Sequence, residues 1–184
     1  MHTTPEVDSA ITVVGAVTRT ATPPLDGLRV WLEGTAVSHF MNWSWWAWPT
    51  AESLHFVGLS TLFATVIVFD LRLLGMLPGV RPAHLERLIP WGVGGFVLSL
   101  STGALFFTGI PGMYLANPAF WVKTLLLLAA GANLAVYQLW ARPRVARLAA
   151  GEPMPMLARL CGLGSLAIWT GVLVAGRLIA FYKP

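Results

Sequence analysis

Charged residues and cysteine are both scarce in this sequence of 184 residues. Only 11% of the residues are charged, 56% are hydrophobic, and the mean hydropathy is +0.68. A soluble domain carries about 25% charged residues, so this composition cannot cover a surface that faces water on all sides. The single cysteine, Cys161, can form no internal disulfide, and we interpret it as a small buried residue. The formal net charge of +4 is too small to indicate a nucleic-acid partner.

The sequence also lacks the residue patterns of familiar catalytic sites. No Ser/His/Asp, Cys/His or phosphate-loop arrangement occurs along the chain. A hydrolase or a transferase is therefore the least favoured class of protein, and we expect a protein that is not an enzyme.

Long apolar runs are what the sequence has in abundance. Crossing a bilayer as a helix takes about 20 residues, and four runs reach that length: residues 52–77, 88–110, 118–140 and 157–181. Prolines separate the runs, and Pro118 stands where the third helix would begin. Small residues spaced four apart, Gly95, Ser99 and Gly103, predict close helix packing. We therefore predict an all-α integral membrane four-helix bundle, formed by residues 51–184.

Two further segments precede the bundle. Residues 1–27 are rich in Thr, Pro and Gly and lack the basic leader of a signal peptide, so we expect a mobile tail. Residues 28–50 contain five tryptophans, a residue that prefers the membrane–water interface. This Trp-rich segment is expected to lie along the lipid headgroups, and the alternative is an aromatic wall over a ligand site.

Arginine distribution predicts the orientation. Arg72, Arg81 and Arg87 lie around the first loop, Arg142, Arg144 and Arg147 lie in the third, and the second loop carries no charge. Positively charged loops stay in the cytoplasm. Both termini are therefore expected on the outer side of the membrane, and the lipid bilayer is the expected partner. The sequence leaves open a homo-oligomer or a partner protein in the membrane or periplasm.

Four ionisable residues are predicted at similar depth near the outer face, on three different helices. They are Glu52, His55, Lys123 and Arg177. Charges inside a bilayer are costly, so such a group calls for a partner or a purpose. One interpretation is an ion-pair lock in which Glu52 bridges Lys123 or Arg177. The other is a ligand site for a quinone carbonyl, an anion or a metal.

A second group is predicted at the inner face. It contains Asp70, Arg72 and Arg87, and Asp70 is expected to pair with Arg87 across helices, because residues two apart on a helix do not face each other. An interfacial salt-bridge group is the simpler interpretation.

The histidines suggest two candidate cofactors, haem and copper. His55 and His84 are predicted at opposite faces, about 30 Å apart, and cannot share a haem. His39 could meet His55 only if the segment before the first span folds down. Copper is suggested by His39, Met41, His55 and Met113, all toward the outer face, because Cu(I) accepts imidazole and thioether ligands. No dense Met or His motif supports that site.

Several motifs between residues 50 and 182 together resemble a known family. The strings are Glu52-Ser-Leu-His-Phe-Val-Gly58, Asp70-Leu-Arg-Leu-Leu-Gly75, Arg87-Leu-Ile-Pro-Trp91 and Ala175-Gly-Arg-Leu-Ile-Ala-Phe-Tyr182. They resemble small bacterial inner-membrane proteins that form an uncharacterised family, a domain of unknown function. This resemblance implies a four-span fold and supplies no activity.

A looser similarity is to CopD-type copper-resistance membrane domains, which also carry a histidine in an early span. Members of the uncharacterised family often have a histidine near the end of the third span, after an Asn. Here Asn133 is followed by Tyr137 and Gln138 instead, which further disfavours haem.

Taken together, the sequence favours a membrane protein that handles a small solute or an ion, or serves as a membrane subunit, through the group near the outer face. A redox protein that binds haem b or quinone is the alternative, and copper handling is the second alternative.

Overall fold

Four long helices dominate the structure, a computed structural model that describes residues 23–149 and 151–181. They are α4 (Ala47–Leu73), α6 (Ile89–Gly109), α8 (Pro118–Val136) and α10 (Met156–Ile179). With short extensions, all four are long and apolar enough to cross a membrane. No strand occurs in the described residues, so the predicted all-α class and the four spans are confirmed.

The ends of the helices differ from the predicted runs by a few residues. Helix α4 begins at Ala47, five residues before Glu52, because Pro49 lies in the first turn, where a backbone N–H has no helical partner anyway. It ends in a Schellman motif, with Met76 N–H bonded to the Leu71 carbonyl and Gly75 at φ +87°. Helix α8 begins at Pro118 as predicted, with Asn117 as its N-cap.

The third span extends further than residue 140. Helix α8 continues through η2, a π-helical turn (Tyr137–Ala141), into α9 (Arg142–Val145). The backbone N–H of Arg142 bonds to the carbonyl of Tyr137, five residues earlier. Such π-helical turns are rare and are frequently found at functional sites.

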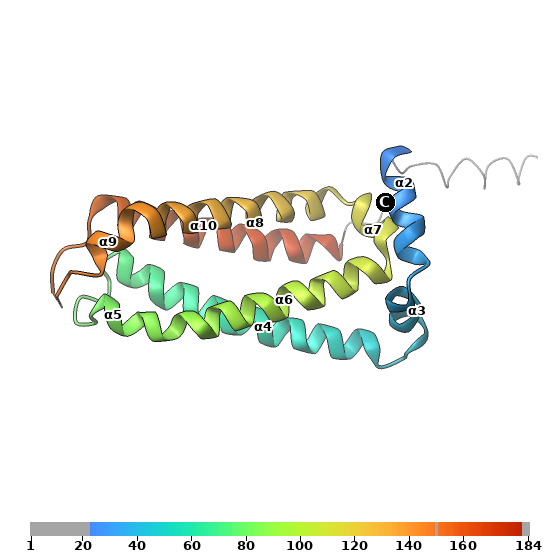
Figure 1. Ribbon diagram of the computed structural model, residues 1–184, viewed down its shortest axis with the longest axis horizontal. Coiled ribbons are helices and arrows are strands. Elements are labelled where there is room, and N and C mark those ends of the chain that lie inside the picture. Colours follow the sequence, from blue (N-terminus) through green and yellow to red (C-terminus); the bar gives the residue numbers. More distant parts are fainter. Residues whose placement is uncertain (1–22, 150, 182–184) are drawn as a thin grey trace, which may run out of the picture.

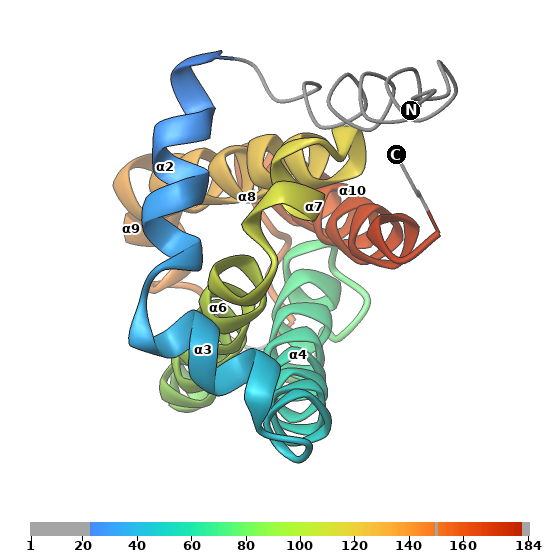
Figure 2. The same cartoon turned by 90° about the vertical axis from the view of Figure 1, so that its right-hand side faces the viewer.

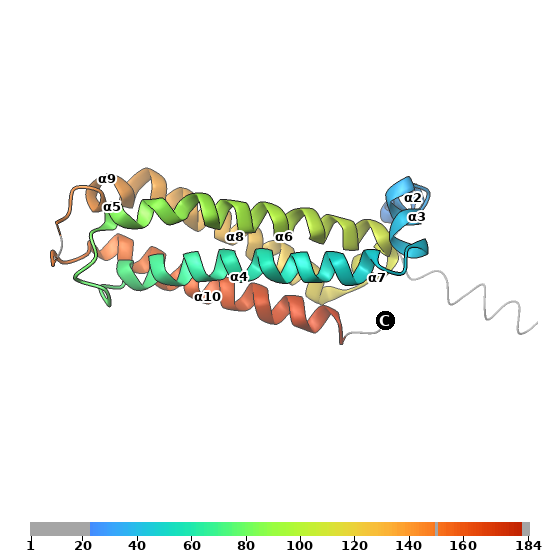
Figure 3. The same ribbon diagram turned by 90° about the horizontal axis from the view of Figure 1, so that it is seen from below.

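The long helices are arranged as two pairs (Figure 1, Figure 3). Helix α4 packs along α6, α8 packs along α10, and α10 also packs against α4. The backbones of α6 and α8 stay apart along most of their length, and near the collar their side chains Phe107 and Phe120 stack, with ring centroids 5.4 Å apart. The bundle is therefore closed on three sides and loose on the fourth.

Short elements occupy the two ends of the bundle. At one end, α2 (Pro23–Glu33) and α3 (Ala36–Trp43) run across the bundle beside α7 (Pro111–Leu115), and we call α2 and α3 the collar (Figure 2). At the other end lie α5 (Pro82–Leu85), the 3-10 turn η1 (Glu86–Leu88) and α9, and we call this the arginine end. The predicted tail, residues 1–22, lies outside the described residues.

The collar is attached to the bundle by a few polar bonds and exposes its tryptophans. The Asn42 side chain donates to the carbonyl of Gly109 at the end of α6, 2.8 Å away. Trp31, Trp43 and Trp45 are each more than two-thirds exposed, as an interfacial segment requires. Trp48 instead stacks on Phe106, with ring centroids 5.5 Å apart.

Small residues bring α4 and α6 into backbone contact, as their spacing predicted. A Cβ atom added to Gly95 would lie 2.7 Å from the Gly58 carbonyl oxygen and 2.7 Å from the Leu62 nitrogen. A Cβ on Gly58 would likewise lie 2.6 Å from the Ser99 hydroxyl. Side chains larger than hydrogen are therefore excluded from this contact.

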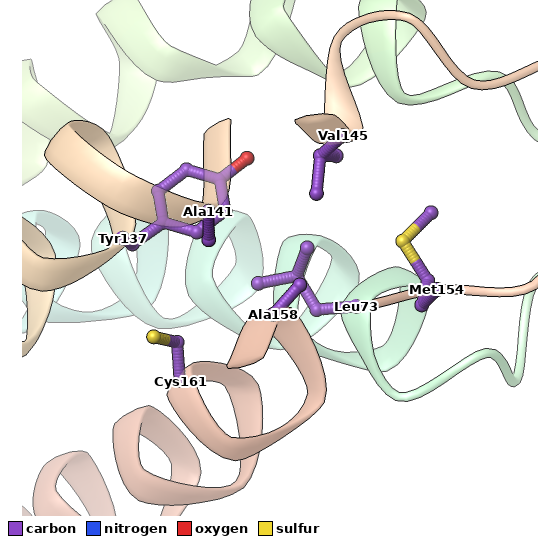
Figure 4. Packing of buried hydrophobic residues seen from close by; sticks show 7 residues of the cluster. All are labelled: Leu73, Tyr137, Ala141, Val145, Met154, Ala158 and Cys161. Carbon is purple, nitrogen blue, oxygen red and sulfur yellow. The ribbon is translucent and has the colours of Figure 1, made fainter. Parts of the chain in front are cut away.

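A hydrophobic cluster closes the arginine end. It joins the end of α4, the π-helical turn, α9 and the start of α10 (Figure 4), through Leu73, Tyr137, Ala141, Val145, Met154, Ala158 and Cys161. Cys161 is buried here as a small apolar residue, as predicted. This cluster fixes how α4, α8 and α10 are placed relative to one another.

We expect Gly95→Ala to destabilise the bundle by about 1–3 kcal/mol, because the added methyl group overlaps the backbone of α4. Thermal unfolding in mild detergent, followed by circular dichroism, measures the effect. Gly94→Ala is the matched control, since a Cβ at Gly94 meets nothing within 4 Å. Equal stability of the two variants would contradict the close contact.

Candidate functional site

A cavity of about 420 Å³ lies within the bundle, toward its arginine end. All four long helices contribute to its wall, and most of the wall is apolar. The cavity lies where α6 and α8 fail to pack against each other. It is large enough for a small organic molecule and is mostly apolar, as ligand sites usually are.

The cavity opens sideways, between α6 and α8. Val93 on α6 and Leu134 on α8 both line it and are each more than half exposed. Gly131 on α8, one turn from Leu134, also lines the cavity, and a Cβ there would meet nothing within 4 Å. Because these helices cross the membrane, the exposed wall at this opening faces lipid. A molecule dissolved in the bilayer can therefore enter without passing through water.

Asp70 is the buried acid in this cavity. Its residue is 4% exposed, and its Oδ2 atom has no hydrogen-bond partner. The Ser165 hydroxyl of α10 lies beside the carboxyl group, and no cation of the described residues lies within ion-pair distance of it. An intramembrane carboxyl group without a partner is costly, so it marks a candidate functional residue.

Aromatic and amide side chains surround this carboxyl group. Each of the four spans contributes one aromatic ring to the wall of the cavity. The rings belong to Phe69, Phe96, Tyr137 and Trp169. The Phe69 and Tyr137 rings meet edge to face, 5.5 Å between centroids. Asn133 donates to the Cys161 carbonyl at 3.0 Å, which leaves its amide oxygen free to accept.

The π-helical turn shapes this wall. Tyr137, Gln138 and Arg142, at the two ends of the turn, all line the cavity. A regular α-helix would place residues beyond the turn at a different angle about the axis, because the π turn adds one residue.

An ion pair closes the rim of the cavity at the arginine end. The guanidinium of Arg142 donates to the Glu86 carboxylate from Nη2 at 3.1 Å and from Nε at 3.3 Å. Both side chains line the cavity, and they connect the beginning of the α6 span with the end of the α8 span. Arg142 is therefore neutralised by Glu86, while Asp70 is not neutralised.

The structure places two of the four residues predicted near the outer face inside the bundle. His55 on α4 is hydrogen-bonded through Nδ1 to the Thr102 hydroxyl at 2.8 Å and meets the Phe106 ring edge to face. Lys123 on α8 is partly buried, with Nζ 3.5 Å from the position that a Cβ on Gly176 would take.

The other two residues, Glu52 and Arg177, are exposed. The Arg177 guanidinium lies over the Phe181 ring, 4.8 Å from its centroid. Burial and the nearby Glu52 carboxylate raise the pKa of the Tyr114 phenol above its ordinary value. Among the described residues, no ion pair joins Glu52 to Lys123 or Arg177.

The inner group is arranged differently from its predicted pairing. Arg72 is buried and donates through Nε to the Val80 carbonyl, and it does not line the cavity. Arg87 is exposed, and no ion pair within 4.0 Å joins it to Asp70 in the described part of the chain. The ion pair found at this end is Glu86 with Arg142 instead.

The candidate metal ligands occupy different surroundings. His39 and Met113 line a second, shallower cavity of about 490 Å³ between the collar and α7. Met41 is buried against Ala47 and Ala51, and His55 is bonded to Thr102. Within residues 23–149 and 151–181, no three His, Cys, Asp or Glu side chains lie close enough together to hold a metal ion.

The cavity itself was not predicted from the sequence, although several of its residues were noted. Asp70 was assigned to a salt-bridge group, and Asn133, Tyr137 and Gln138 were seen as polar positions. The available signal was that an acid and an amide occur within apolar runs on two different helices. That signal gives depth in the membrane, but it cannot show that α6 and α8 stand apart.

The fold defines a multi-pass α-helical membrane protein with a cavity inside its bundle. The most apolar window of each span has at most 22% of its residues buried, so most of its surface must face lipid. The family model of DUF6644, a family of unknown function, matches residues 45–182, and the chain belongs to this family. No curated protein and no solved structure matches the chain.

The Glu86–Arg142 pair contributes little to stability, because both side chains are 40% or more exposed. In a double-mutant cycle of Glu86→Gln and Arg142→Gln, we expect a coupling energy of about 0–1 kcal/mol. Thermal unfolding of the four proteins in the same detergent gives this value. A coupling above about 2 kcal/mol would show that the pair holds the α6 and α8 spans together.

Proposed function

We propose that this protein binds a lipid-soluble small molecule, which enters from the bilayer between α6 and α8. The molecule lies in the 420 Å³ cavity, with its polar part at Asp70. The observation that carries this proposal is the buried Asp70 carboxyl group, which has an unpartnered oxygen in an apolar cavity that opens toward lipid. The sequence also predicts the handling of a small solute or an ion, but at the group near the outer face. The cavity supports a binding site toward the arginine end instead.

A purely structural role accounts poorly for Asp70. A structural acid in a membrane bundle is normally paired with a base or fully hydrogen-bonded. Here the nearest arginine in sequence, Arg72, binds the Val80 carbonyl, and Arg142 binds Glu86. A ligand that supplies the missing partner would satisfy the open oxygen atom.

The group near the collar supports a function less well. His55 is hydrogen-bonded to Thr102 through Nδ1, and Glu52 and Arg177 are exposed side chains that line neither of the two cavities described above. Long basic side chains near helix ends can extend toward the interface without any ligand.

We also propose that the protein lies in a bacterial inner membrane with its arginine end in the cytoplasm. The collar and the end of α10 would then lie on the periplasmic side (Figure 1). Arginine enrichment at one end of the bundle supports this orientation.

Reporter fusions test the orientation in cells. We expect alkaline phosphatase to be active when fused after Pro184 or in the loop at Ala116, and inactive when fused after Gly79. Fluorescent-protein fusions at the same sites should give the opposite pattern. Phosphatase activity at Gly79 would reverse the proposed orientation.

Photolabelling tests the binding site. The purified protein in lipid nanodiscs is irradiated with a neutral, lipid-soluble alkyl diazirine, and the labelled residues are mapped by mass spectrometry. We expect labelling of the cavity residues Asp70 and Ser165 in addition to lipid-facing residues. Gly131→Leu should strongly reduce labelling inside the cavity, because its side chain has room to occupy the opening.

Gly94→Leu is the matched control for this experiment. It makes the same substitution on the adjacent span, at a glycine that also has open space around it but does not line the cavity. Its labelling pattern should equal that of the wild type. If the wild-type cavity is not labelled, or if both variants lose the labelling equally, the proposal is wrong.

A further inference from the structure

The charges that line the cavity indicate the chemical class of its ligand. The described residues of the wall include three charged side chains, Asp70, Glu86 and Arg142. Arg142 and Glu86 neutralise each other at the rim, 3.1 Å apart. The Asp70 carboxyl group remains, with an oxygen atom that accepts no hydrogen bond. When Asp70 is ionised, the described wall of the cavity has an excess negative charge, because its one cation, Arg142, is already paired with Glu86.

The aromatic rings of the wall match the same ligand. Phe69, Phe96, Tyr137 and Trp169 reach the cavity from the four spans. Phe69 is the sequence neighbour of Asp70 on α4, and its ring meets the Tyr137 ring edge to face. The face of an aromatic ring carries negative potential and attracts a positive charge, an attraction that strengthens when water is excluded. Together with a carboxylate, such rings form a site for a cation that is itself apolar at its surface.

The route of entry selects the ligand further. A small hydrated cation would have to leave water and cross lipid to enter between Val93 and Leu134, at a large cost in desolvation. An organic cation with its charge spread over or shielded by hydrocarbon partitions into the bilayer and avoids most of that cost. We infer that the cavity between α6 and α8 binds amphipathic organic cations, with the positive centre at Asp70. This inference rests on the function proposed above and specifies its ligand.

Anions and neutral lipids fit this cavity less well. An anionic headgroup would need Arg142, but Arg142 already donates two hydrogen bonds to Glu86. The Asp70 carboxylate would repel the same headgroup if it moved deeper. A neutral molecule can fill the apolar volume, but it supplies no positive charge to pair with an ionised Asp70.

Two ions of the same shape and opposite charge provide a direct test. Tetraphenylphosphonium and tetraphenylborate are each equilibrated by dialysis with the protein in nanodiscs of zwitterionic lipid, and empty nanodiscs correct for partition into the lipid. We expect saturable binding of about one tetraphenylphosphonium per protein and no saturable binding of tetraphenylborate.

Variants of Asp70 identify the group responsible. Asp70→Asn keeps the shape of the side chain and removes its charge, so it should weaken tetraphenylphosphonium binding at least about tenfold. Asp70→Glu restores the charge and should retain binding within a few-fold. Gly131→Leu should weaken binding as well, whereas Gly94→Leu should not. Circular dichroism and thermal unfolding confirm that each variant is folded before binding is measured.

The outcomes separate this inference from the proposed function. Equal saturable binding of both ions, or an unchanged affinity for tetraphenylphosphonium in Asp70→Asn, would overturn the cation inference. If tetraphenylphosphonium does not bind while the neutral diazirine still labels the cavity, the cation inference is wrong and the proposed binding of lipid-soluble molecules stands. If neither probe reaches the cavity, both proposals are wrong.

Discussion

Close packing at glycine residues holds three sides of this bundle together. Gly95 meets Gly58 between α6 and α4, Gly162 meets Leu73 between α10 and α4, and Gly171 meets Leu126 between α10 and α8. In lipid, helix association depends on such van der Waals contact, since the surroundings are as apolar as the side chains. The fourth side, between α6 and α8, has no comparable contact, and Gly131 there faces open space. The cavity exists because close packing stops at this side.

The position of Asp70 follows from the same contacts. A Cβ on Gly162 would lie 3.2 Å from the Asp70 carbonyl, so α10 approaches the backbone of α4 at this residue. The tight contact fixes the main chain, and the carboxyl group is left at the wall of the open side. A flexible loop could not hold an unpartnered acid in this way, because the acid would turn toward water. The helix packing therefore supplies the rigidity that a binding site requires.

The two ends of the bundle have different physical roles. The collar end carries charges of both signs, among them Asp26, Arg29 and Glu33 on α2, whereas the arginine end combines several arginines with a buried hydrophobic cluster. The cavity lies toward the arginine end, and Tyr137 and Gln138, where the π-helical turn begins, line its wall. The chain belongs to the DUF6644 family, and substitutions at Tyr137 and Gln138 can test whether this cavity has a function.

The sequence by itself determined the four spans and their close packing at Gly95 and Ser99, because apolar length, proline position and the spacing of small residues are local properties. It also located Asp70 and Asn133 at their approximate depth. Only the tertiary structure decided that Asp70 has no basic partner and that Glu86, rather than Asp70, pairs with an arginine. Helical periodicity does not define how each helix is rotated about its own axis. The predicted start of the first span, Glu52, also lies five residues after the observed start of α4, Ala47. The π-helical turn and the gap between α6 and α8 depend on contacts between distant segments, which no local pattern records.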